Sequence, residues 1–178
     1  MRLKNRLSLL MIASTVILGY SNYANAAGSA NGEIAVTLDV TAGCTVGVAN
    51  DGQWGTLNFG TVSEIDNDIN STVVWNSGLN ITCSNLLPYS LTFANGSNFD
   101  TTKNVRRLVY NTTNFIPYRL YKDAAYATEI SSTAVDYTGT GTVDNVPIYG
   151  RILIDDQNAL VAPAAGTYTD TVAVTLTW

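Results

Sequence analysis

Apolar and polar residues alternate near the end of the first quarter of the chain. The apolar row consists of Ile34, Val36, Leu38 and Val40. Small or polar residues fill the positions between them. Because successive side chains of a strand point to opposite faces, this period of two predicts an extended strand with one apolar face. Residues 27–32, just before it, are small and polar, so we expect them to be flexible.

A second alternation closes the chain. One parity carries Tyr168, Asp170, Val172, Val174, Leu176 and Trp178, and the other is mostly threonine. The pattern predicts a strand over residues 168–178, long enough at about 3.3 Å per residue to run the height of a β-sandwich. No later residue follows that could pair beside it. We therefore expect this strand either to pair with earlier segments on both sides or to leave an open edge.

Between these alternations lie further short runs rich in β-branched and aromatic residues, each bounded by Gly, Asn, Asp or Pro. They cover residues 54–62, 72–75, 79–83, 89–93, 105–110, 115–121 and 146–154. No window has a sustained helical period with caps at both ends. Turn signals about every ten residues favour one all-β domain of the sandwich or barrel type.

The two alternations are complementary. An extended peptide can complete a sheet by adding as a strand, with its alternate side chains in pockets. If the four apolar residues of the first row each filled a pocket, the gross gain would be about 6 to 12 kcal/mol. The same segment fits equally well as the first strand of its own sandwich, so the pattern leaves donation to a neighbour and self-completion open.

The N-terminal residues match a secretory signal. Three basic residues precede an apolar run over residues 7–18, and the small-residue pattern ending at Ala26 follows. The run is shorter than the roughly 20 residues of a transmembrane helix, which disfavours an anchor. We expect cleavage after Ala26, an N-terminal extension that carries the apolar row over residues 27–41, and a domain over residues 42–178.

The amino-acid composition excludes several kinds of catalytic and metal site. Among 178 residues, 46% are hydrophobic, 13% are charged and none is histidine. Histidine-dependent triads and histidine-bearing zinc sites are therefore excluded, and we expect no catalytic residue, metal or cofactor. The formal net charge is −5, and removal of the signal would make it more negative. Capture of nucleic-acid phosphates is thus disfavoured.

Export also bears on the two cysteines. In an oxidising compartment, an even pair such as Cys44 and Cys83 is expected to form a disulfide. Closing a loop of about 40 residues would stabilise the fold by about 4 kcal/mol in the chain-entropy model. The alternative is two separate buried thiols.

Four groups of polar or aromatic residues could have a functional role, but each also has a simpler structural explanation. Residues 66–70 imitate the opening of a calcium loop but lack the glycine and glutamate that such a loop needs, so we expect a solvated turn. The pair Asp155 and Asp156 resembles an exposed turn more than an acid–base pair. Arg106 and Arg107, with Lys103, form a basic cluster that we expect to be solvated, with a neighbouring subunit's acidic surface as the alternative. Tyrosines such as Tyr118, Tyr121 and Tyr149 could stack on sugars, but packing in the core and sheets explains them more simply.

The order of several short motifs resembles a known family. They are LNFGTV at 57–62, ITC at 81–83, PYSL at 88–91, PYRLYKD at 117–123, PIYGRI at 147–152 and AGTYTDTV at 165–172. Together they resemble the spore coat protein U domain and, more closely, the major rod subunits of archaic, Csu-type chaperone-usher pili. The resemblance extends from about residue 34 to residue 178.

This resemblance implies an incomplete immunoglobulin-like β-sandwich that donor-strand exchange completes. The donor residues would be Ile34, Val36, Leu38 and Val40. The acceptor groove would have Tyr168, Val172, Val174, Leu176 and Trp178 on one wall and the segment starting near Cys44 on the other. The implied partners are a periplasmic chaperone, an outer-membrane usher, identical subunits in a homopolymer and other pilus subunits.

The resemblance also implies a function. The expected protein is a structural subunit that is exported through the periplasm to a cell-surface pilus and supports attachment and biofilm formation. The presence of a donor segment, and the lack of room for a receptor-binding domain, favour a rod subunit over a tip adhesin. A self-complete secreted β-sandwich, acting as a coat or ligand-binding module, is the alternative.

Overall fold

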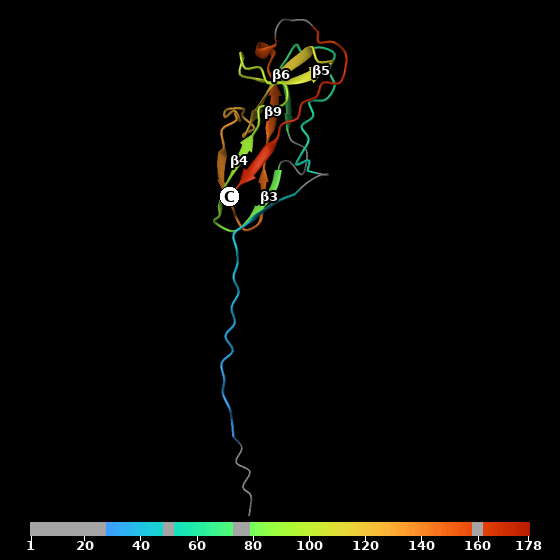
Figure 1. Ribbon diagram of the computed structural model, residues 1–178. Coiled ribbons are helices and arrows are strands. Elements are labelled where there is room, and N and C mark those ends of the chain that lie inside the picture. Colours follow the sequence, from blue (N-terminus) through green and yellow to red (C-terminus); the bar gives the residue numbers. More distant parts are fainter. Residues whose placement is uncertain (1–27, 48–51, 73–78, 158–161) are drawn as a thin grey trace, which may run out of the picture. The chain divides into compact units, whose positions relative to one another are not determined.

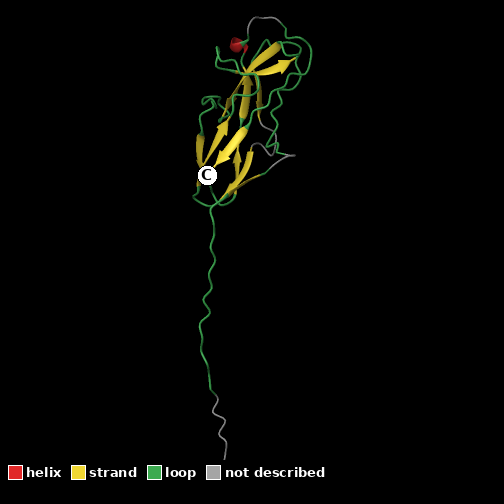
Figure 2. Cartoon of the chain, in the orientation of Figure 1, coloured by secondary structure: helices red, strands yellow, loops and turns green. Residues whose placement is uncertain are grey.

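The structure is built almost entirely of strands. It is a computed structural model that describes residues 28–47, 52–72, 79–157 and 162–178 (Figure 1). Within these residues there is a single short 3-10 turn, Ile154–Asp156, and no helix long and apolar enough to cross a membrane (Figure 2). The all-β prediction is therefore confirmed. The expected signal peptide, residues 1–26, lies outside the described residues.

Ten strands follow one another along the described chain. They are β1 Cys44–Val46, β2 Ile69–Thr72, β3 Leu79–Cys83, β4 Pro88–Phe93, β5 Arg106–Tyr110, β6 Asn114–Tyr121, β7 Val135–Thr138, β8 Val143–Val146, β9 Tyr149–Ile152 and β10 Val174–Thr177. Chain contacts divide the protein into two units, residues 1–39 and 40–178. The strands all lie in the second unit.

The described part of the first unit has no regular secondary structure. No helix or strand is present between residues 28 and 43. The apolar row of this segment is exposed, with exposed fractions of 89% for Ile34, 87% for Val36, 84% for Leu38 and 81% for Val40. An exposed row of four large aliphatic side chains is unfavourable in water, because each would gain free energy on burial.

The strands of the second unit form three antiparallel sheets. Their orders are β1-β3-β8, β10-β4-β7 and β2-β9-β6-β5. Figure 1 shows β10, in red, beside β4, in green. Both β1 and β10 are edge strands in the described part of the chain, since β1 pairs only with β3 and β10 only with β4.

The core comes from alternate positions of all three sheets. In β3 the burial alternates strictly, with Leu79, Ile81 and Cys83 inside. In β4 the buried residues are Tyr89, Leu91 and Phe93. One contiguous cluster joins these side chains to those of β6, β8 and β9. Burial alternates with a period of two in β3, β4 and β9, one strand from each sheet, and the cluster forms an apolar layer between the sheets, as in a sandwich.

Four predicted runs are confirmed within a residue at each end. They correspond to β3, β4, β5 and β6. The run over 146–154 is instead divided into the end of β8 and β9, because Pro147 cannot donate to a ladder. The strands β7 and β8 were not predicted, and β2 begins inside the polar stretch at 66–70 that we expected to be a turn.

Two predicted strands are wrong in extent. Residues 54–62 contain no strand, although Leu57 and Phe59 are half-buried between exposed neighbours. The C-terminal run forms β10 only over Val174–Thr177, with one further bridge between Thr169 and Val109. In both stretches the side chains alternate as in a strand, but no neighbouring strand continues the ladder.

The basic cluster does not consist of solvated charges. Arg106 is only 3% exposed, and its guanidinium donates to the carbonyls of Ile130 at 2.7 Å and Ala94 at 3.0 Å. Burial lowers the pKa of this guanidinium. Arg107 pairs with Asp100 at 3.3 Å and lies over the Phe115 ring. Our expectation failed because a buried arginine satisfied by carbonyls has no signature in sequence composition.

The acidic pair is also not a plain exposed turn. Asp155 is exposed, but Asp156 accepts from Arg119 Nε at 2.6 Å and from Arg119 Nη2 at 3.0 Å. This bidentate pair ties the 3-10 turn to β6 and raises the pKa of Arg119. The carboxylate is therefore engaged in a structural ion pair.

Candidate functional site

A cavity of about 670 Å³ opens into the core of the second unit. Its lining combines strand residues, including Leu79, Phe93, Leu108 and Leu120, with the segments 52–57 and 170–174. The strand residues are apolar and come from β3, β4, β5 and β6. The cavity therefore reaches the side-chain layer that holds the sheets together.

A second hollow of about 370 Å³ continues along the C-terminal strand. It is lined by Cys44, Val46, Trp54, Val174, Thr175, Leu176 and Trp178. Trp54 and Val174 line both spaces. We call the two spaces together the groove. It follows the chain from residue 170 to residue 178, with β1 and the segment 52–59 opposite.

Within the described ranges, the backbone of β10 has hydrogen-bonding groups without a strand partner on its groove side. Val174 to Thr177 pair with β4 on one side only. The carbonyl of Ala173 accepts from Ala94 N at 2.8 Å, so it points toward β4. Because these directions alternate along a strand, the amide and carbonyl groups of Val174 and Leu176 point to the open edge.

The opposite wall depends on a glycine in β9. Leu57 and Phe59 pack against Gly150, where an added Cβ would lie 2.6 Å from a Leu57 methyl group and 2.9 Å from the Phe59 ring. Phe59 also meets Tyr118 edge-on, with ring centroids 6.0 Å apart. The missing side chain at Gly150 thus lets the irregular segment around Leu57 and Phe59 approach β9 closely.

One end of the groove carries a fixed carboxylate. Asp170 accepts from the Tyr118 hydroxyl at 2.7 Å and from Ser97 N at 2.8 Å, and it lies against Gly96. Burial, together with this hydrogen bond, raises the pKa of the Tyr118 phenol. Apart from this end, the strand residues that line the groove are mainly apolar, so the site suits an extended apolar segment better than a polar ligand.

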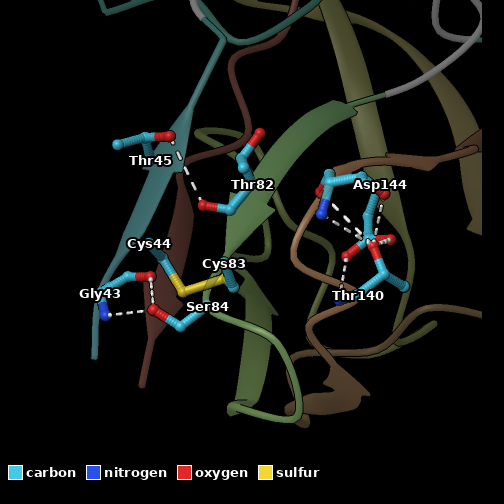
Figure 3. The surroundings of a disulfide bond; sticks show 9 residues. Gly43, Cys44, Thr45, Thr82, Cys83, Ser84, Thr140 and Asp144 are labelled. Carbon is cyan, nitrogen blue, oxygen red and sulfur yellow. Dashed lines mark hydrogen bonds between the residues drawn. A yellow bond between two sulfur atoms is a disulfide. The ribbon is translucent and has the colours of Figure 1, made fainter. Parts of the chain in front are cut away.

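The predicted disulfide is confirmed. Cys44 and Cys83 are bonded and stand opposite each other in the β1–β3 ladder (Figure 3). Beside them, Gly43 N donates to Ser84 Oγ at 3.1 Å, and Ser84 N donates to Gly43 O at 3.0 Å. The short strand β1 is therefore fixed at its first residue, and Cys44 lines the groove.

The structure brings most of the predicted acceptor residues together. Val172, Val174, Leu176 and Trp178 all line the groove. Tyr168 does not, because its ring packs on Tyr110 with centroids 5.6 Å apart and its hydroxyl donates to Ala164 O at 2.9 Å. The predicted donor residues 34, 36 and 38 lie in the other unit and Val40 at its border.

Sequence reasoning missed the side chains that form the far wall and floor of the groove. Trp54, Leu57 and Phe59 were predicted to lie in an ordinary strand, and so were Leu108 and Leu120, with no groove role for any of them. The alternation of residues 54–59 was a usable signal for a half-buried segment. Its place opposite β10 was not visible, because that depends on the close approach at Gly150.

The acidic stretch 66–70, which resembles the opening of a calcium loop, makes structural contacts through Asp68. Asp68 accepts from Arg151 Nη2 at 2.6 Å and from Ile154 N at 2.9 Å. No group of three or more acidic or cysteine side chains suited to a metal occurs in the described ranges. Asp68 therefore connects the start of β2 to β9.

These features define a class: an all-β domain with a largely apolar groove between two of its edge strands, β1 and β10. The model of the Spore Coat Protein U domain family matches residues 30–175, and the chain belongs to this family.

Two other comparisons were made. A similar solved structure is the CsuC–CsuE chaperone–tip adhesion subunit pre-assembly complex from the archaic chaperone-usher Csu pili of Acinetobacter baumannii. The identity is 23% and the TM-score 0.49, and the match covers 78% of this chain but only 40% of the other. No curated protein matches this chain.

Proposed function

We propose that the protein is a structural subunit of a surface pilus that polymerises head to tail by donor-strand exchange. The N-terminal segment of one copy enters the groove of the next copy and completes its sandwich. The observation that carries this proposal is the groove itself, which runs beside an edge strand and opens into the core.

The segment and the groove have matching periods. The donor row, Ile34, Val36, Leu38 and Val40, repeats every two residues and is more than 80% exposed at each position. The groove strand presents Val172, Val174, Leu176 and Trp178 at the same period. Free backbone groups at the open edge supply main-chain hydrogen bonds, and burial of four aliphatic side chains supplies about 6 to 12 kcal/mol of gross stabilisation.

The proposed partners follow from the same incomplete sandwich. Before assembly the groove needs a temporary occupant, since an open apolar groove beside an edge strand promotes aggregation. A periplasmic chaperone fills this role, and an outer-membrane usher exchanges it for the next subunit. Membership in the Spore Coat Protein U family and the motif order of Csu-type rod subunits support this route. We expect identical copies in a rod, contacts with other pilus subunits, and a role in attachment and biofilm formation.

A structural rather than catalytic role fits the site. Its fixed polar group, Asp170, is already bonded to Tyr118 and Ser97. The disulfide fits export through an oxidising compartment. The protein therefore acts by packing and polymerising, and its expected destination is the cell surface.

The decisive experiment alters one face of the donor segment. Leu38→Asp places a charge in an apolar pocket at a cost of several kcal/mol, roughly. Thr37→Asp is the matched control, because residue 37 has the opposite parity and would face away from the groove. We expect fibres from the control and none from Leu38→Asp, counted by electron microscopy on cells that carry the secretion partners. Equal fibre yields from both variants would refute the proposal.

A second measurement separates donation from self-completion. A chain without residues 27–40 is purified, and a synthetic peptide covering residues 30–42 is added. Donor-strand exchange predicts a rise in the unfolding temperature that a Leu38→Asp peptide does not produce. If the full chain instead forms a stable monomer that ignores the peptide, the self-complete secreted module is correct.

A further inference from the structure

An exposed leucine lies in an unfavourable backbone conformation at one end of the second unit. Leu86 has a φ of 62° and is 75% exposed. It occupies the third position of the turn Ser84–Leu87, which is closed by a 3.1 Å bond from Leu87 N to Ser84 O. Glycine or asparagine suits positive φ at this position of a turn. Neither the positive φ nor the exposure to solvent favours a leucine at this position.

This turn is held firmly against its neighbour. Leu86 N donates to Gly139 O at 2.8 Å, and Gly139 N donates to Leu87 O at 2.8 Å. The neighbouring turn, residues 139–143, is itself braced where Thr140 Oγ1 donates to Asp144 at 2.8 Å (Figure 3). It leads into Val143, which is 63% exposed. We call these two turns, with their exposed Leu86 and Val143, the linker-end surface.

The linker-end surface adjoins the point where the N-terminal segment leaves the second unit. Gly43 and Ser84 exchange hydrogen bonds in both directions, so Gly43 is fixed two residues from Leu86. Only Thr41 and Ala42 separate Gly43 from Val40, the last residue of the donor row. Three steps along an extended chain span about 11 Å at most.

From this spacing we propose that the linker-end surface is a second contact between successive subunits, occupied by the copy that accepts the donor segment. This inference rests on the proposed function. A donor segment seated to Val40 brings the accepting copy within about 11 Å of Gly43. That distance is too short for a domain to stay clear of the adjacent turns. The exposed side chains of Leu86 and Val143 then become buried at the junction.

The consequence is a junction with a preferred angle. Without this contact, residues 41–43 act as a free hinge between subunits. With it, each junction is held at two places, the groove and the linker-end surface. The rigid backbone of the two turns means that little conformational entropy is lost when the contact forms.

The test compares fibres of the unaltered chain with fibres of a Leu86→Asn, Val143→Thr double variant. Asparagine tolerates the positive φ, so the fold is preserved. Val62→Thr is the control, because Val62 is 50% exposed on another loop. We expect the fibre yield to be unchanged. The ratio of junctions at the preferred angle to junctions at other angles should fall about tenfold, because the contact loses one buried leucine. The same angular distribution in both fibres, measured in electron micrographs, would overturn the contact.

A probe of the surface gives an independent readout. Leu86→Cys introduces the sole free thiol, since Cys44 and Cys83 are bonded. A polarity-sensitive dye at this thiol should shift its emission to shorter wavelength in fibres relative to unassembled subunits, and a dye at Val62→Cys should not. Emission that stays the same at residue 86 refutes the contact. Failure of the proposed function is distinguishable, because the unaltered chain would then form no donor-dependent fibre at all.

Discussion

The phenol of Tyr118 in β6 donates a 2.7 Å hydrogen bond to the carboxylate of Asp170, which precedes β10. Tyr118 is only 4% exposed, and both residues line the groove. The bond connects a long internal strand to the C-terminal segment that forms one groove wall. The position of that wall therefore depends on a proton that stays on the phenol.

The stability of the fold should fall at high pH. The phenol ionises near pH 10 in the unfolded chain, whereas burial and then the bond to Asp170 raise its pKa in the fold. As the pH rises, the Tyr118 phenol therefore ionises in the unfolded chain before it ionises in the folded chain. The protonated phenol makes its full contribution to stability below pH 10. Above pH 10 the free energy of unfolding falls by about 1.4 kcal/mol per pH unit. Urea unfolding of peptide-completed subunits at pH 9, 10 and 11 measures this slope.

Tyr118→Phe provides the matched control for this slope. It loses the hydrogen bond and about 1 to 2 kcal/mol at neutral pH. Its stability should then decline less steeply above pH 10, by about 1.4 kcal/mol over the first unit. The phenols of Tyr89, Tyr121, Tyr137 and Tyr168, whose pKa values are also raised by burial, account for the slope that remains. Identical slopes in the two proteins would contradict the assignment to Tyr118.

The buried Arg106 should matter more than its neighbour. Replacing it with methionine leaves the carbonyls of Ala94 and Ile130 without their donor, at a cost of about 3 kcal/mol in the free energy of unfolding. Arg107→Met should cost less than about 1 kcal/mol, because its ion pair with Asp100 is partly exposed. Chemical denaturation ranks the two variants. A larger loss for Arg107→Met would show that the buried hydrogen bonds contribute little.

Removal of the disulfide should destabilise the domain strongly. The Cys44→Ala, Cys83→Ala double variant frees a connection between residues 39 positions apart, with an expected loss of about 4 kcal/mol. The exposed fraction of the β1 wall should rise, because β1 has only three residues. Hydrogen exchange of the Thr45 and Gly47 amides, which face β3, reports this loosening. Protection equal to that of the unaltered chain would mean that the β1–β3 ladder is sufficient alone.

Gly150→Ala should damage the groove wall. The added methyl group would lie 2.6 Å from a Leu57 methyl carbon, so Leu57 and Phe59 must move, at a cost of about 1 to 3 kcal/mol. We expect weaker binding of the 30–42 peptide, measured by calorimetry. Gly43→Ala is the control, because no atom lies within 4 Å of a Cβ at that position. If both variants bind the peptide equally well, the wall does not depend on Gly150.

Much of this fold could be predicted from local pattern. The strands β3 and β4 have buried residues at alternate positions, and β3, β4, β5 and β6 are all rich in β-branched and aromatic residues with turn residues near their ends, so local pattern located them. The pairing of Cys44 with Cys83 followed from an even count of cysteines in an exported chain. The predicted row Val172, Val174 and Leu176 does line the groove, because alternation alone decides which side chains share a face.

Other features depend on contacts between distant residues and had no local signal. The burial of Arg106 requires carbonyls from two segments that meet only in the fold. The segment 54–59 alternates like a strand but forms none among the described residues, and pattern alone predicted a strand there. Tyr168 has the right parity for the groove but is turned toward Tyr110. In each case tertiary packing decided between options that the sequence left equal.

The position of the disulfide determines how a pulling force would pass through the domain. A pull on the N-terminal segment reaches the domain at Cys44, the first residue of β1 and the first that could be peeled from β3. The covalent bond to Cys83 carries that load directly into β3, the central strand of its sheet. Tension along a chain of such subunits would therefore bypass the weak three-residue ladder, and the groove wall would keep its shape under load.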